Sequence, residues 1–166
     1  MAAYYGTEAW VLASRDWGEA DRLVTSYAKD IGRIDAVAKG VRRVSSKLRG
    51  HLNIFSHTRV LLTPGKDFWR LLDAEADNIP EGSRKLLFAE ECREFFLRVV
   101  THALPDEHMW EALLVLRDID RKDKVVRFKL HILAALGILP ERLEKNIDGQ
   151  IEQLLAQNHI APAKTF

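Results

Sequence analysis

The chain has 166 residues, of which 47% are apolar and 30% charged, and its formal net charge is +1. This balance is typical of a soluble globular protein with one ordinary domain or two small ones. The first residues lack a cationic leader, and the apolar run at 9–13 is too short for a signal peptide or a membrane span, so a cytoplasmic protein is expected.

The first part of the chain predicts five short strands, because apolar and β-branched residues gather in short runs between turn signals. The expected strands are Thr7–Arg15, Arg22–Ala28, Gly32–Lys39, Ile54–Thr63 and Phe68–Ala74. The run PGKD at 64–67 is typical of a hairpin turn between the last two. Five strands with one long connection, between the third and the fourth, suit a small Greek-key barrel of the OB type.

After the turn residues at 78–82 the apolar period changes to that of helices. The expected helices are 83–104, 106–118, 120–136 and a weaker one at 148–157. Asp106 can cap the second helix, and Gly137 closes the third. The expected architecture is therefore an OB-fold barrel over residues 1–79 followed by a small helical domain over 80–166.

Positive charge is concentrated in residues 32–66, where no acidic side chain lies between Asp35 and Asp67. Most of it falls on the long connection between the third and fourth strands, where 45–51 has room for a turn or two of helix. Such a block attracts a polyanion, and nucleic acid needs several spaced cations. A solvated surface loop is the alternative. The candidate phosphate-binding residues are Arg33, Lys39, Arg42, Arg43, Lys47, Arg49 and Arg59.

Two other single residues invite interpretation. Phe55, His57 and Arg59 alternate along the fourth strand, so Phe55 either stacks on a nucleobase or fills the barrel core, and the core reading is favoured. Cys92 has no partner for an internal disulfide and lies in an apolar segment, which predicts a buried, inert thiol.

An enzyme would need a constellation of catalytic groups, and the nearest candidates are acids that could hold magnesium in a nuclease. These are Asp16, Glu19, Asp21, Asp30 and Asp35. Acids at turns are ordinarily solvated or capping, and the chain has no Walker loop or nucleophile elbow. The histidines show no short ligand spacing, so neither a metal nor a cofactor is expected. An RNA-binding OB module and a pure interaction scaffold stay open as alternatives.

Residues 8–56 resemble the amino-terminal domain of the RecO family of bacterial recombination mediators. The matching motifs follow one another as GEAD at 18–21, GR at 32–33, AKGVRR at 38–43 and SKL at 46–48. A weaker similarity covers VVRFKLHILAALGILPE at 125–141. The resemblance implies an OB-fold that binds single- and double-stranded DNA, anneals strands and helps to load recombinase on DNA coated with single-strand-binding protein, without catalysis.

The resemblance also implies partners, among them RecR and RecA, and a nucleoid-associated location. Many family members carry paired CxxC motifs that bind zinc just after the third helix and then continue for tens of residues. This sequence reads GILPE at 137–141 and has no cysteine there, which excludes a tetrahedral thiolate site.

The segment RKDKVVRFKLH at 121–131 holds five Lys/Arg against one Asp. Lys124, Arg127 and His131 recur at intervals of three and four residues and so share a helix face. A cationic rim beside an apolar stripe suits a short acidic peptide that ends in an aromatic residue. Resemblance to the RecO family suggests the tail of single-strand-binding protein. A solvated helix face is the alternative.

Overall fold

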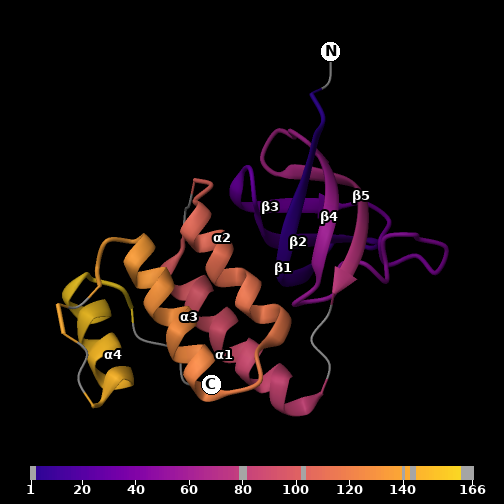
Figure 1. The fold of residues 1–166 in the computed structure, drawn as a ribbon. Coiled ribbons are helices and arrows are strands. Elements are labelled where there is room, and N and C mark those ends of the chain that lie inside the picture. Colours follow the sequence, from indigo (N-terminus) through magenta and orange to yellow (C-terminus); the bar gives the residue numbers. More distant parts are fainter. Residues whose placement is uncertain (1–2, 79–81, 102–103, 140, 143–144, 162–166) are drawn as a thin grey trace.

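The computed structural model describes residues 3–78, 82–101, 104–139, 141–142 and 145–161. Five strands come first and helices follow (Figure 1). The barrel and the helices lie side by side, with the loop between β3 and β4 projecting on the side away from the helices. The expected order, an OB-type barrel followed by a helical part, is confirmed.

The strands form a closed barrel in the order β1-β2-β3-β5-β4. Their bounds are β1 Tyr5–Trp17, β2 Asp21–Ala28, β3 Gly32–Ala38, β4 His57–Thr63 and β5 Trp69–Asn78. β1 is long enough to pair with both β2 and β4, and a register shift between Val11 and Ala13 helps it to curve. The barrel closes between β3 and β5 through only three parallel pairs, Ala36–Ala38 with Trp69–Leu71.

Two strand boundaries differ from the sequence expectation by three residues or more. β4 begins at His57 and not at Ile54, because Phe55 takes a left-handed backbone conformation with φ 70° that a strand cannot contain. β5 continues to Asn78 and not only to Ala74, since its antiparallel pairing with β4 extends that far.

The barrel interior is filled by side chains that alternate along the strands. On β3, for example, Ile34, Ala36 and Ala38 are buried while Asp35 is exposed. The long connection contributes as well, because Val41 and Leu52 are buried in the same cluster. The two ends of this connection are therefore part of the barrel core.

The helical part consists of α1 Ser83–Val99, α2 Glu107–Leu114, α3 Lys122–Ala135 and α4 Ile147–Gln157, with a 3-10 turn, η1, at Val115–Asp118. Asp106 caps α2 as expected, its carboxylate accepting the Met109 N–H at 2.9 Å. α1 ends at Val99, earlier than expected, and residues 102–103 of its expected end lie outside the described residues. Leu86 and Leu87, near the start of α1, are exposed.

Cys92 lies within the buried stripe of α1, and burial raises the pKa of its thiol to about 12. The predicted burial of this thiol is confirmed. Within the described ranges, none of the helices combines the length and the apolar composition that a membrane span needs.

The barrel and the helices share one hydrophobic cluster. Trp10, Leu12, Tyr27 and Phe55 on the barrel side pack with side chains from all four α-helices. Polar contacts cross the same junction, since the Asp106 N–H donates to the Tyr27 hydroxyl at 3.0 Å and Arg93 donates to the Leu12 carbonyl at 3.3 Å. The junction therefore sets which faces of the barrel stay open to a ligand.

Candidate nucleic-acid interface

The basic loop, residues 39–53, runs from β3 to β4 and is fixed at both ends. At its start the Gly40 N–H donates to the Asp21 carboxylate at 2.7 Å. After its end the Phe55 N–H donates to the Val11 carbonyl at 2.8 Å. Between these points it forms hydrogen-bonded turns and not the short helix that the sequence allowed. The loop therefore projects its side chains from a fixed base.

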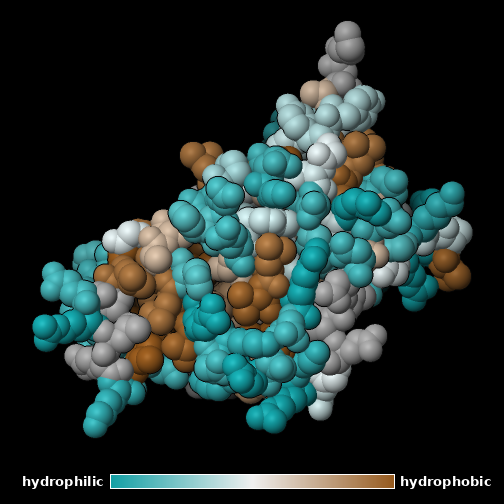
Figure 2. All heavy atoms as spheres, viewed as in Figure 1, coloured by the Kyte–Doolittle hydropathy of each residue, from teal (hydrophilic) through white to brown (hydrophobic). Residues whose placement is uncertain are grey.

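Four cations of the basic loop point to solvent: Lys39, Arg43, Lys47 and Arg49. Within the part of the chain that the structure describes, no acid or carbonyl pairs with their charged groups. Figure 2 shows hydrophilic side chains around this projection, at the right of the view, with a hydrophobic group among them. Val44, at 89% exposure, is the apolar residue of the loop most open to solvent.

Arg42 has a different role from its neighbours. Its guanidinium donates to the Glu19 carbonyl at 3.1 Å and lies 3.4 Å from the Asp16 carboxylate. It thereby fastens the basic loop to the turn between β1 and β2. Part of its charge is already neutralised by Asp16, so it offers less to a phosphate than the four solvent-exposed cations named above.

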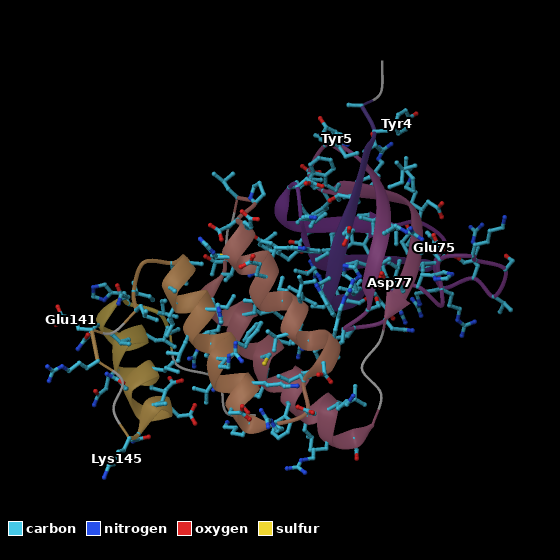
Figure 3. All side chains as sticks on the ribbon, viewed as in Figure 1. Tyr4, Tyr5, Glu75, Asp77, Glu141 and Lys145 are labelled. Atoms are coloured by element: carbon cyan, nitrogen blue, oxygen red, sulfur yellow. The ribbon has the colours of Figure 1, made fainter. Side chains whose placement is uncertain are left out.

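Two other predicted phosphate contacts lie elsewhere. Arg33 is half-buried and donates to the carbonyls of Leu97 and Val100 at the end of α1. Burial lowers the pKa of its guanidinium, and Asp35 partly opposes this. Arg59 is exposed on β4 but pairs with Glu75 of β5 at 2.9 Å (Figure 3 labels Glu75). The structure therefore does not bring these two together with the loop cations.

The expected alternation of Phe55, His57 and Arg59 on one strand face is wrong, because Phe55 precedes β4. Its side chain is 6% exposed and packs in the cluster shared with the helices. His57 is also buried, with Nε2 3.1 Å from Glu8 and Nδ1 2.7 Å from Asp77. Burial leaves Phe55 no open face on which a nucleobase could stack.

The acids considered for a magnesium site are engaged separately. Asp16 faces Arg22 and Arg42, Asp30 accepts the Thr7 hydroxyl at 2.7 Å, and Asp35 accepts the Thr25 hydroxyl. Among the described residues, no three of His, Cys, Asp and Glu come together as metal ligands.

The predicted peptide-binding face of α3 is only partly free. Lys124 lies 2.9 Å from both Asp118 and Asp120, whereas Arg127 and His131 are exposed. Lys124 and Arg127 line a cavity of about 220 Å³ together with Leu114, Val115 and Asp118. The cavity is lined by apolar side chains and by two cations, but the acidic Asp118 lines it as well.

Sequence reasoning missed an aromatic pair beside the basic loop. Trp17 ends β1 and Phe68 precedes β5, and their rings meet edge to face with centroids 5.3 Å apart. The guanidinium of Arg15 lies over the Trp17 ring at 5.2 Å. The available signal was the position of both aromatics next to turns, where a core role is less expected.

Comparison with known proteins identifies a family model that matches the barrel. Residues 1–79 match the family model described as "Recombination protein O N terminal". The matched segment ends one residue after β5, so it covers the whole barrel and the basic loop.

Several curated relatives named DNA repair protein RecO match beyond the barrel. The relative from Pelotomaculum thermopropionicum is 31% identical over 82% of this chain and 56% of its own length. The one from Dehalococcoides mccartyi is 28% identical over 95% of this chain and 66% of its own length. The one from Heliobacterium modesticaldum is 41% identical over 43% of this chain and 26% of its own length. This chain spans about half the length of the curated relatives that it matches along most of its sequence.

Proposed function

This chain belongs to the RecO family of DNA repair proteins, and we propose on that premise that its barrel binds single- and double-stranded DNA through the basic loop. In this proposal the chain is a non-catalytic recombination mediator. It anneals complementary strands and helps to load recombinase on DNA that is coated with single-strand-binding protein.

One observation carries the proposal: a loop whose ends are fixed in the barrel holds four exposed cations that have no partner among the described residues. Cations without internal partners are free to replace the counterions of a phosphate backbone. Because the loop base is anchored, less ordering entropy is lost on binding than in a disordered basic segment. Contacts of this kind position DNA but read no bases, so little sequence preference is expected.

Annealing follows from the same chemistry. Two complementary strands repel each other through their phosphates, and a cluster of cations that neutralises several phosphates lowers this repulsion. No nucleotide hydrolysis is needed, because duplex formation itself is favourable. The loop would therefore act by charge neutralisation and proximity.

The salt dependence of DNA binding tests the proposal. If Lys39, Arg43, Lys47 and Arg49 each contact a phosphate, log K falls against log salt with a slope of about −2.8 for single strands and −3.6 for duplex. Replacing Arg43, Lys47 and Arg49 with alanine should make the single-strand slope shallower by about two units. Fluorescence anisotropy over a salt series measures both.

The matched control removes three exposed cations from the helical part, Arg84, Arg142 and Lys145. Lys145 lies at the opposite end of the molecule from the basic loop (Figure 3). The net charge changes equally in both variants, so a specific loop site predicts a normal slope for the control. An equal loss in both variants, or an unchanged slope in the loop variant, would rule out the loop as the phosphate-binding site.

For recruitment we propose that Arg127 and His131 hold the acidic tail of single-strand-binding protein beside the 220 Å³ cavity. Lys124 contributes less, because Asp118 and Asp120 already neutralise it. A fluorescent tail peptide should bind with micromolar affinity and lose binding in Arg127→Glu, while DNA binding persists. Contacts with RecR and RecA belong to the same proposal, and pull-down with each purified partner tests them.

The RNA-binding alternative predicts that RNA displaces labelled DNA better than unlabelled DNA of equal length does. Phosphate contacts alone do not separate DNA from RNA, since only contacts to the 2′-hydroxyl do so. The proposal therefore expects unlabelled DNA to displace labelled DNA at least as well as RNA of equal length. A pure scaffold would bind neither at physiological salt.

A further inference from the structure

Beside the basic loop the barrel exposes an aromatic surface that phosphate binding leaves unexplained. Trp17 is 37% exposed at the end of β1, although large aromatic side chains are usually well buried. Phe68 meets Trp17 edge to face, and the guanidinium of Arg15 lies 5.2 Å from the centre of the Trp17 ring. Together these three side chains form a small aromatic platform, of which Trp17 is partly open to solvent.

The platform adjoins the cationic loop through short covalent and polar connections. Trp17 directly precedes the turn residues Gly18 and Glu19, whose carbonyls accept hydrogen bonds from Arg42 at 3.5 and 3.1 Å. Arg42 in turn immediately precedes Arg43, one of the four solvent-exposed cations. The phosphate backbone of a nucleic acid held by the basic loop would therefore pass within a few nucleotides of the Trp17 ring.

The Phe68 side of the platform opens into a cavity of about 410 Å³ between the first half of β3 and the β4–β5 turn. The cavity is open because β3 pairs with β5 only from Ala36 onward. Gly65 shapes its wall, since a Cβ there would lie 2.1 Å from the Phe68 carbonyl oxygen. Only glycine allows the turn to fold so closely against Phe68, so the position of this aromatic residue is set by the local backbone.

We propose that Trp17 and Phe68 stack the bases of single-stranded nucleic acid whose phosphates are held by the basic loop. This inference rests on the proposed function and deepens it. Aromatic rings beside a cationic groove are the combination that binds single strands without sequence preference. In OB-folds the connections at these two places, β1–β2 and β4–β5, commonly border the oligonucleotide site.

The same geometry distinguishes single strands from duplex. Bases within a duplex are already stacked and present no free face, so the platform adds nothing to duplex affinity. Arg15 at the Trp17 ring, and the basic loop that Arg42 ties to the adjoining turn, also favour a polyanion over an uncharged apolar partner. Stacking therefore makes the chain prefer single strands, while the basic loop alone serves both forms.

Tryptophan emission provides a direct readout. The chain has four tryptophans, of which Trp10 and Trp110 are buried and Trp69 is partly buried. Stacking on Trp17 predicts quenching of emission when oligo-dT is added. Trp17→Phe keeps an aromatic face, so it should bind oligo-dT nearly as tightly as wild type but lose most of the quenching. Undiminished quenching in Trp17→Phe would contradict stacking at this residue.

Affinity measurements complete the test. Trp17→Ala and Phe68→Ala should each weaken oligo-dT binding about tenfold and leave duplex binding unchanged. Leu87→Ala, which removes an exposed apolar side chain from α1, should change neither. If Phe68→Ala fails to fold, the two Trp17 variants decide alone. Normal oligo-dT affinity in Trp17→Ala overturns the inference and leaves the proposed function intact, whereas wild type that binds neither form overturns both.

Discussion

Arg33 connects the barrel to the end of α1. Its guanidinium donates to the carbonyls of Leu97 and Val100, which lie in the last turn and at the C-cap of α1. Carbonyls there lack partners within the helix and carry the negative end of its dipole. A half-buried cation that satisfies them stabilises both the helix end and the junction.

We therefore predict that Arg33→Ala lowers the free energy of unfolding by about 2 kcal/mol, the usual range for hydrogen bonds from a charged group. The salt slope for DNA binding should stay unchanged, because Arg33 contacts no phosphate in our proposal. Urea denaturation and anisotropy measure the two effects. Arg59→Ala is the matched control, since its exposed ion pair with Glu75 contributes about 0 to 1 kcal/mol. If Arg33→Ala has a shallower salt slope for DNA binding and a normal free energy of unfolding, Arg33 contacts a phosphate.

At the scale of elements, Glu91 connects α1 to α3 and, through Lys129, to α4. Its carboxylate accepts hydrogen bonds from Lys122 at 2.6 Å and Lys129 at 2.7 Å, and Lys129 reaches Asp148 of α4 at 3.2 Å. Burial tends to raise the pKa of Glu91, but the hydrogen bonds and charges of the two lysines outweigh it and lower the pKa below its usual 4.5. The network thus stabilises the ionised carboxylate in the folded state.

A lowered folded-state pKa gives stability that is present above pH 4.5 and is lost as the pH falls through the folded-state value. Glu91→Gln should therefore reduce stability by about 1 kcal/mol at pH 7, a modest effect because the pair is partly exposed. The difference from wild type should shrink as the pH drops below 4.5. Thermal unfolding over pH 3–7 measures it, with the exposed Glu141→Gln as control. A difference independent of pH would mean that Glu91 acts through packing.

At the scale of the whole molecule, the junction core makes the barrel and the helices depend on each other. Phe55→Ala should cost about 3 to 4 kcal/mol, as for other buried phenylalanines. Because the cluster spans both parts, unfolding should remain one transition. Far-ultraviolet circular dichroism reports the helices, and emission from buried Trp10 and Trp110 reports the junction. Two separate midpoints would show that the parts unfold independently.

Local sequence signals were sufficient for most of the fold. The alternation at 32–39, the turn PGKD and the cap at Asp106 each depend on neighbours in the chain, and the structure has β3, the β4–β5 turn and α2 where they predict. The contacts of Arg33 and the position of Phe55 outside β4 have another origin. Arg33 bonds to a carbonyl 64 positions away, Phe55 packs in a cluster with side chains of the helices, and no periodicity in a single segment encodes such contacts. Trp17 was missed for the same reason, since its significance depends on Phe68 and on the loop beside it.

The anchoring of the basic loop separates the residues that hold the fold from those that carry charge. Val41 and Leu52 fill the barrel, while residues 43–47 between them are mostly exposed. Closing a loop of slightly different length costs only a few tenths of a kcal/mol, so substitutions and small insertions at the tip leave the barrel folded. The sequence of the loop tip can therefore change, and with it the polyanion that is bound, while the barrel fold is kept.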